Sequence, residues 1–195
     1  MKVLGIAGSP RSGSNTDILL TEVLRGAESK GAETKIIHVT NLNMMDCSHC
    51  DACIRSGNCP FQDDSQKVFK EMEDADVIVL AAPLHFMGLP SQMKKLIDRA
   101  QSLWVRKYVL KTPPLVPAKE RRGLFVSVGG RSGEHVFDAA LATVKAFFAS
   151  LDIKYIGMVS FVGVEGRAIV LDHPKMKQAA FEAGEKLAEA TTPAA

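Results

Sequence analysis

One run of seven residues, Asp-Val-Ile-Val-Leu-Ala-Ala from Asp76 to Ala82, constrains the fold of this chain more than any other feature. A strand that faces solvent on one side alternates apolar and polar residues, whereas this run is apolar after its first residue. Unbroken apolarity is typical of a central parallel strand that is covered on both faces. The run therefore predicts a parallel sheet between two layers of helices.

Strand-like and helix-like segments alternate five times along the chain, which predicts an α/β fold with right-handed crossovers. We treat residues 1–195 as one domain. The predicted strands are Val3–Ala7, Lys35–Val39, Asp76–Ala82, Leu124–Val128 and Tyr155–Val162, and the predicted helices are Asn15–Lys30, Ser65–Met72, Ser91–Trp104, Val136–Leu151 and Lys175–Ala190.

Composition excludes several classes of function. The formal net charge of +2 is too small to indicate binding to nucleic acid or to an anionic membrane. No segment reaches the roughly 18 apolar residues of a transmembrane helix, and the N-terminus lacks the pattern of a signal peptide. We therefore expect a cytoplasmic protein. Residues 111–122 are rich in Pro, Lys and Arg and predict an exposed connection.

Ligands of parallel sheets bind in the loops beyond the carboxyl ends of the strands, here the loops that begin at Gly8, Pro83 and Gly129. The first loop, Gly8–Thr16, offers hydroxyls, an amide, a guanidinium and the free N–H groups of a helix N-terminus, all good partners for phosphate oxygens. It matches neither the dinucleotide nor the Walker pattern, so a terminal monophosphate is favoured. The alternative is a Ser/Asn-rich turn that only caps the helix.

The second loop, from Pro83 to Pro90, can place backbone polar groups along the edge of a flat heterocycle and cover its face with apolar side chains. His85 is either a polar contact at the ring edge or a surface histidine. Phe86 and Met87 are either part of this pocket or core residues. In the third loop, a close approach of ligand is favoured at Gly129.

All four cysteines lie in one loop at residues 46–60, with the spacing C-x2-C-x2-C-x5-C-P. This run resembles the cluster-binding run of bacterial ferredoxins, and Gly57 can provide the bend that returns the fourth cysteine, so that one [4Fe–4S] cluster finds four local thiolates. Zinc, two disulfides or no metal at all remain alternatives. His49 is not expected to be a ligand, since four thiolates suffice. The four candidate ligands are Cys47, Cys50, Cys53 and Cys59.

The phosphate loop, the cysteine run, the pair Asp63-Asp64 and the segments AAPLHFMGLPSQMKKLIDR and SVGG resemble the iron–sulfur flavoproteins of archaea and anaerobic bacteria. These belong to the wider NADPH-dependent FMN reductase group of flavodoxin-like proteins. The resemblance covers roughly residues 1–165. It implies a flavodoxin-like three-layer sandwich with a five-stranded parallel sheet in the order 2-1-3-4-5.

The resemblance also implies the cofactors and their sites. It assigns the FMN phosphate to Ser9, Arg11, Ser14, Asn15 and Thr16, the edge of the isoalloxazine to Pro83, Leu84, His85, Phe86, Met87 and Gly88, and one [4Fe–4S] cluster to the four cysteines. Members of the family are oligomeric, so we expect a homodimer or a homotetramer with the flavin near a subunit interface.

We therefore expect a redox flavoprotein that relays electrons from a ferredoxin-like donor through a [4Fe–4S] cluster and FMN to an acceptor. No general acid or base is needed for such a relay. The basic segment around Lys119, Arg121 and Arg122 either steers an acidic ferredoxin or only solvates an exposed loop. One alternative is a reductase of FMN or quinones that takes electrons from NAD(P)H and has no functional cluster, and another is a non-catalytic redox sensor.

Overall fold

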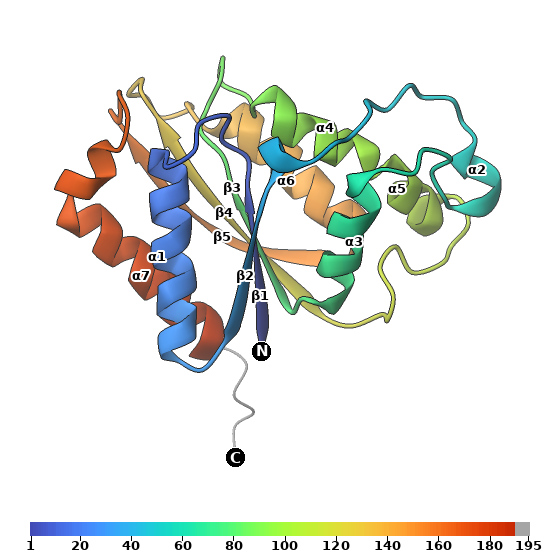
Figure 1. The fold of residues 1–195 in the computed structure, drawn as a ribbon, viewed down its shortest axis with the longest axis horizontal. Helices are drawn as coiled ribbons and strands as arrows, with labels where there is room; N and C mark the ends of the chain where they lie inside the picture. The colour runs from blue at the N-terminus through green and yellow to red at the C-terminus, as the bar shows by residue number, and fades with distance from the viewer. Residues whose placement is uncertain (190–195) are drawn as a thin grey trace.

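A five-stranded parallel sheet forms the middle layer of the structure, a computed structural model that describes residues 1–189 (Figure 1). The strands pair in the order β2-β1-β3-β4-β5, so the predicted order and the three-layer arrangement are confirmed. The strands are β1 (Lys2–Ala7), β2 (Glu33–His38), β3 (Val77–Ala81), β4 (Arg121–Gly129) and β5 (Ile153–Val162). Their carboxyl ends lie at the top of Figure 1.

Helices cover both faces of the sheet, and each face has its own apolar core. α1 (Asn15–Ser29) and α7 (Pro174–Glu189) lie on one side, and α3 (Asp64–Asp74), α4 (Ser91–Arg99), α5 (Gln101–Tyr108) and α6 (Asp138–Ser150) lie on the other (Figure 1). β3 is buried along its whole length and sends side chains into both cores. This confirms that its unbroken apolarity reflects cover on both faces. The short helices are η1 (Val39–Asn41), α2 (Cys53–Ser56) and η2 (Ile169–Asp172).

One predicted helix is divided in the structure, and the ends of the others differ from the predicted ones by at most two residues within the described part of the chain. The single helix expected over Ser91–Trp104 is two helices, because the backbone leaves helical geometry at Ala100, whose N–H caps α4 on the carbonyl of Ile97. Neither glycine nor proline marks this break. The last helix begins one residue earlier than predicted, at Pro174, and the predicted final residue Ala190 lies outside the described residues, as does the rest of the tail.

The connection before β4 is exposed over most of residues 111–120, as predicted, but it ends at a buried arginine. Arg121 begins β4, is 2% exposed, and donates to the carbonyl oxygens of Met72 and Glu73 in the last turn of α3. It thereby serves the carbonyl groups that a helix C-terminus leaves unpaired. Arg122 donates to a backbone carbonyl of α7, and Lys119 forms an ion pair with Asp76. All three side chains are thus engaged within the fold, and the expected steering of an acidic partner by them stays a prediction.

Two glycines allow α1 and α7 to pack backbone against backbone. A Cβ atom added at Gly184 would lie 1.9 Å from the carbonyl oxygen of Val23, and one added at Gly26 would lie 2.0 Å from that of Phe181. Both distances are far below van der Waals contact with backbone atoms that have little room to move. No pattern in the sequence predicts this contact.

We expect Gly184→Ala to destabilise the protein by about 1–3 kcal/mol, because α7 must move away from α1 to admit one methyl group. Chemical denaturation measures this difference. Lys186→Ala, an exposed change on the same helix, is the matched control and should alter stability by less than about 0.5 kcal/mol. Equal stabilities for the two variants would contradict the close packing described above.

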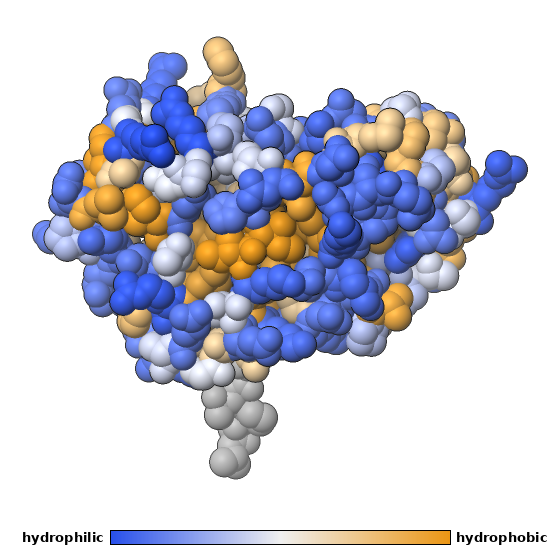
Figure 2. All heavy atoms as spheres, viewed as in Figure 1, coloured by the Kyte–Doolittle hydropathy of each residue, from blue (hydrophilic) through white to orange (hydrophobic). Residues whose placement is uncertain are grey.

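Apolar side chains also gather at one edge of the sheet. Figure 2 shows an apolar patch between α1 and α3, over the edge strand β2, where Ile36 is 37% exposed. Charged and polar side chains cover the helices around it (Figure 2). Within residues 1–189, no helix combines the length and the apolar character needed to cross a membrane.

Candidate functional site

The loop between β1 and α1 prepares a helix N-terminus for an anion. Ser14 is the N-cap of α1, and its hydroxyl accepts from the N–H of Asp17, while the Asp17 carboxylate accepts from the N–H of Ser14 at 3.2 Å. This reciprocal capping box stabilises the first turn of α1. The N–H groups of Asn15 and Thr16, the first two of the helix, have no intrahelical partner. They and the helix dipole favour a negatively charged group.

A cavity of about 170 Å³ lies at this helix N-terminus. All five residues predicted to hold a phosphate line it, together with two predicted ring contacts and three residues of the loop after β5. Pockets that enclose a whole small molecule have volumes of roughly 300–1,000 Å³, so this one fits a phosphate headgroup with the rest of its molecule outside. The lining residues are Ser9, Pro10, Arg11, Ser14, Asn15, Thr16, Pro83, His85, Val164, Gly166 and Arg167.

The Asn15 side chain fixes a wall of the cavity. Its Nδ2 donates to the carbonyl oxygen of Gly166 at 2.9 Å, and its Oδ1 accepts from the N–H of Val170 at 3.1 Å. The amide thereby ties the loop after β5 to the phosphate loop. The Thr16 hydroxyl is buried and lies 3.1 Å from the Ser14 hydroxyl. Contacts to an anion from Asn15 therefore fall to its backbone N–H.

Arg167 is a cavity residue that the sequence analysis missed. It lies in the loop after β5, and its Nη2 donates to the carbonyl oxygen of Ser12 at 3.1 Å. With Arg11 it gives the cavity two guanidinium groups. Its position carries a signal in the sequence, because this loop also follows the carboxyl end of a strand, where ligands of parallel sheets bind.

The turn after β3 projects from the top of the sheet with a strained backbone. The N–H groups of His85 and Gly88 each bond to the carbonyl oxygen of the other at 3.0 Å, which closes a two-residue turn. Its central residues, Phe86 and Met87, have positive φ angles of 49° and 64°, which cost non-glycine residues about 1–2 kcal/mol each. Both side chains are exposed, so neither belongs to the core. Strain of this kind concentrates at functional sites.

Four predicted contacts of the ring or its edge do not line the cavity. Leu84 packs against the core, and Phe86, Met87 and Gly88 belong to the projecting turn. Gly129, the predicted point of close approach of a ligand, is buried, and a Cβ atom there would lie 3.1 Å from Val136 and 3.2 Å from Leu84. Packing beneath the turn thus accounts for its lack of a side chain, and the predicted approach of a ligand to Gly129 stays a prediction.

The four cysteines line a second, separate cavity. It is small, about 20 Å³, and Arg99 shares it. Gly57 ends the single turn of α2 in the left-handed conformation, with φ at 69°, and its N–H bonds to the carbonyl oxygen of Cys53. This is the predicted bend that returns the chain to Cys59. All four thiols are free. No cysteine lines the cavity at the phosphate loop.

The four thiols are close enough to influence one another. Burial raises the pKa of the Cys53 thiol, and the charges of the other three sulfurs raise that pKa further. Within residues 1–189, no group of three or more His, Cys, Asp or Glu side chains is gathered tightly enough to hold a metal ion. The donor set suits a group that takes four thiolates, and the loop would have to draw its sulfurs together around that group.

Asp63 anchors the end of the cysteine loop to the core. It is the N-cap of α3, and its carboxylate accepts hydrogen bonds from the Ser65 hydroxyl, the N–H groups of Met45 and Ser65, and the buried guanidinium of Arg99. Burial opposes ionisation, but these hydrogen bonds outweigh it and hold the pKa of Asp63 at about 2. Its neighbour Asp64 accepts from the N–H of Asn43.

The low pKa of Asp63 predicts a specific loss of stability in acid. The pKa falls from 3.8 to about 2 on folding, so ionised Asp63 stabilises the fold above pH 3.8, and this contribution is lost as the pH falls toward 2. The shift corresponds to about 2 kcal/mol. We expect Asp63→Asn to be less stable than the parent at pH 7 by about that amount and to lose less stability between pH 5 and pH 2. Denaturant titrations from pH 7 to pH 2 measure the free energy of unfolding of both proteins. If it falls equally with pH in the variant and in the parent, the low pKa of Asp63 is contradicted.

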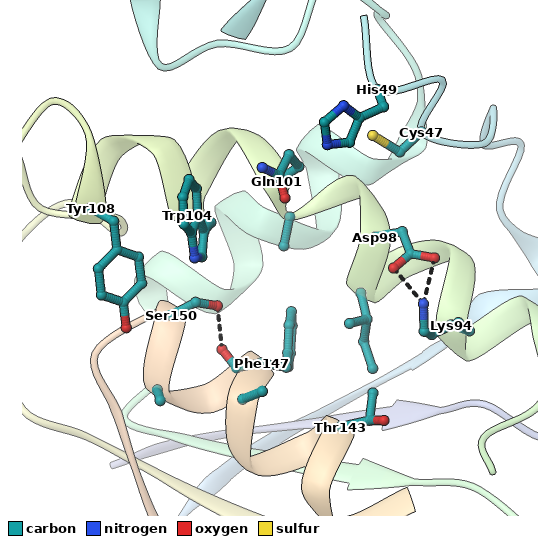
Figure 3. A pocket seen from close by; sticks show the side chains of 14 residues that line it. Cys47, His49, Lys94, Asp98, Gln101, Trp104, Tyr108, Thr143, Phe147 and Ser150 are labelled. Carbon is teal, nitrogen blue, oxygen red and sulfur yellow. Dashed lines mark hydrogen bonds and ion pairs between the residues drawn. The ribbon is translucent and has the colours of Figure 1, made fainter. Parts of the chain in front are cut away.

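A larger hollow, about 610 Å³, adjoins the cysteine loop. Figure 3 shows Trp104 and Tyr108 of α5 on one wall and Phe147 of α6 opposite, with Cys47 and His49 at one end. The two aromatic rings of α5 lie 5.3 Å apart, and each side chain is about 40% exposed. The hollow therefore brings exposed aromatic surface to the edge of the cysteine loop.

A family model described as NADPH-dependent FMN reductase matches residues 1–170. Among curated proteins, an iron–sulfur flavoprotein of Methanocaldococcus jannaschii is 40% identical over 53% of each chain. An iron–sulfur flavoprotein of Methanosarcina thermophila is 34% identical over 67% of this chain and 64% of its own. A second one of Methanocaldococcus jannaschii is 31% identical over 83% of this chain and 77% of its own. The chain thus spans about half to two thirds of the first two relatives.

Solved structures agree on the fold. A flavone reductase has a TM-score of 0.72 with 25% identity, covering 97% of this chain and 62% of its own. An NAD(P)H:quinone oxidoreductase from Methanothermobacter marburgensis has a TM-score of 0.71 with 16% identity, covering 96% of this chain and 98% of its own. The chain belongs to the NADPH-dependent FMN reductase family of flavin-dependent oxidoreductases, in the group of the iron–sulfur flavoproteins.

Proposed function

We propose that this protein binds FMN at the phosphate loop and one [4Fe–4S] cluster at Cys47, Cys50, Cys53 and Cys59, and that it relays electrons between a ferredoxin-like donor and an acceptor. The observation that carries the proposal is that the five predicted phosphate residues line one cavity and the four cysteines line another, and that these two cavities share no residue. One cavity offers guanidinium and helix N–H groups, and the other offers thiols.

At the FMN site, the chain supplies binding and orientation. The hydroxyls of Ser9 and Ser14, the guanidinium groups of Arg11 and Arg167 and the first N–H groups of α1 hold the phosphate. The turn around Phe86 lies beside the same cavity through Pro83 and His85, where it can border a ring attached to that phosphate. When bound, FMN exchanges electrons either singly or in pairs.

At the cysteine loop, the chain supplies four thiolates and the groups that position them. Asp63 and Arg99 fix the loop's C-terminal end, and Gly57 fixes its bend. A four-thiolate iron–sulfur cluster exchanges one electron at a time, and hydrogen bonds to its sulfurs tune its potential. Joined to a flavin, it would link one-electron donors to two-electron acceptors.

We further propose that the protein acts as a homodimer or homotetramer. The cavity at the phosphate loop encloses about 170 Å³, and the side chain of Phe86 beside it is fully exposed. A ring carried by a phosphate in this cavity would remain largely uncovered by its own chain. A second subunit that covers the turn would shield it from solvent.

Anaerobic purification followed by a visible spectrum, iron and sulfide analysis and an FMN titration tests the proposal. We expect about one FMN and about four irons per chain. Protein that holds FMN but takes up no iron after cluster reconstitution would contradict the cluster. Colourless protein that does not bind FMN at micromolar concentration would contradict the whole proposal.

A second candidate is an NAD(P)H-dependent reductase of FMN or quinones in which the cysteines hold no cluster. The family description favours it, and so does the absence of gathered metal-binding side chains within residues 1–189. Anaerobic mixing with NADPH separates the two candidates. Rapid bleaching of the flavin without a ferredoxin would favour the reductase, whereas bleaching that requires a reduced ferredoxin favours the relay.

A further inference from the structure

Arg99, the last residue of α4, is a buried cation beneath the cysteine loop. It is 1% exposed, yet it lines the cavity that the four cysteines share. A buried guanidinium requires compensation by a charge and by hydrogen bonds. It finds the charge in the carboxylate of Asp63, and it donates to the carbonyl oxygens of Met45 at 2.9 Å and Phe61 at 3.3 Å. These contacts clamp both ends of the cysteine loop.

Two further features of Arg99 are not explained by a clamp. Its Nη2 also donates to the sulfur of Cys59 at 3.3 Å, and its Nε is buried without any hydrogen-bond partner within the described residues 1–189. An unpaired buried donor is costly, and an acceptor brought into the shared cavity by a bound group would remove that cost. The guanidinium therefore has both a contact to one candidate ligand and a spare donor.

We propose that Arg99 is a positioning residue that donates a hydrogen bond to the Cys59 thiolate and thereby raises the reduction potential of a cluster bound by the four cysteines. The inference rests on the proposed function, because it needs the cluster. It goes beyond it by assigning a role in the chemistry of the site to a residue that is not a ligand.

The direction of the effect follows from electrostatics. Adding one electron makes a thiolate-bound cluster more negative, and a hydrogen bond from a cation stabilises that extra negative charge in a buried site. Asp63 offsets part of the positive charge of Arg99. However, its carboxylate accepts from Nη1 of the guanidinium, whereas Nη2 donates to the sulfur of Cys59. Loss of the donor should therefore favour the oxidised cluster.

Arg106 provides a matched control on the same loop. Its guanidinium donates to the carbonyl oxygen of Gly57 at 2.9 Å and to the side-chain oxygen of Asn58 at 2.8 Å, but to no sulfur. Arg106→Lys and Arg99→Lys thus both keep a positive charge and both remove an arginine that holds the loop. Only Arg99→Lys removes a sulfur contact.

The test is an anaerobic redox titration of the reconstituted wild type and the two variants, followed by electron paramagnetic resonance, with iron content and melting temperature measured on the same samples. We expect Arg99→Lys to make one-electron reduction of the cluster about tenfold less favourable, which is a potential lower by 59 mV for a one-electron couple. Arg106→Lys should change it by less than threefold, and the potential of FMN should be unchanged in both.

Arg99→Lys protein that carries four irons at the wild-type potential would overturn the inference and reduce Arg99 to a structural clamp. Wild-type protein that takes up no iron would overturn the proposed cluster and this inference together. If Arg99→Lys does not fold, Asp63→Asn decides the question, because it keeps Arg99 and removes its compensating charge. We then expect reduction to become more favourable, and an unchanged potential would again overturn the inference.

Discussion

We expect the Cys53→Ser variant to bind FMN but to lose the four irons of the proposed cluster. Cys53 starts the turn α2 in the middle of the cysteine run, and it lines one cavity together with the other three cysteines. A serine hydroxyl stays protonated and is a poor ligand for iron. We therefore expect the iron content to fall from about four per chain to less than about one, with loss of acid-labile sulfide.

The same variant should keep its affinity for FMN within about twofold, because Cys53 does not line the cavity at the phosphate loop. His49→Ala is the matched control in the same loop, since it removes a potential metal ligand that four thiolates make unnecessary, and it should retain four irons. Iron and sulfide analysis and an FMN titration of each variant measure these effects. A Cys53→Ser protein with a full complement of iron would exclude the four-cysteine site, and iron loss in His49→Ala would assign the histidine a role that we do not expect.

The architecture of the protein could be predicted from its sequence because apolar runs report burial directly. The most apolar run became β3, which is buried along its whole length at the centre of the sheet. Sequence patterns do not report burial in the same way for a charged residue. Arg121 looked like part of an exposed basic connection, but the carbonyl groups at the end of α3 accept its donors and allow it to begin β4. Composition does not reveal such a partner.

The residues that line the cavity at the start of α1 could be predicted from the sequence because most of them lie close together in one loop and their chemistry is local. Contacts between distant segments were not visible in the same way. The amide of Asn15 bonds to a carbonyl 151 residues away, so its role in fixing the wall appears only in the folded chain. The same holds for Arg167 and for the contact of Gly26 and Gly184, in which two helices from opposite ends of the chain meet. Arg99 ends the segment AAPLHFMGLPSQMKKLIDR, but its contact with Cys59 has no sequence signature.

Removing both guanidinium groups of the phosphate cavity, in Arg11→Ala combined with Arg167→Ala, is expected to weaken FMN binding about 100-fold. Each arginine can contribute a charge-assisted hydrogen bond to a dianionic phosphate, and solvent exposure reduces the value of each. The N–H groups of α1 and the hydroxyls of Ser9 and Ser14 remain, so binding should be weakened and not abolished. Titration of flavin fluorescence measures the dissociation constants.

Riboflavin, which lacks the phosphate, makes this prediction specific to the cavity. The double variant should bind riboflavin within about twofold of the wild type, so its preference for FMN over riboflavin should fall by the same factor of about 100. Arg131→Ala is the matched control, because this exposed arginine follows another strand and does not line the cavity. An equal loss of FMN and riboflavin binding in the double variant would show that the arginines support the fold or the ring instead. In that case the cavity at the start of α1 would not be the phosphate site, since a charge that recognises a phosphate must distinguish the two flavins.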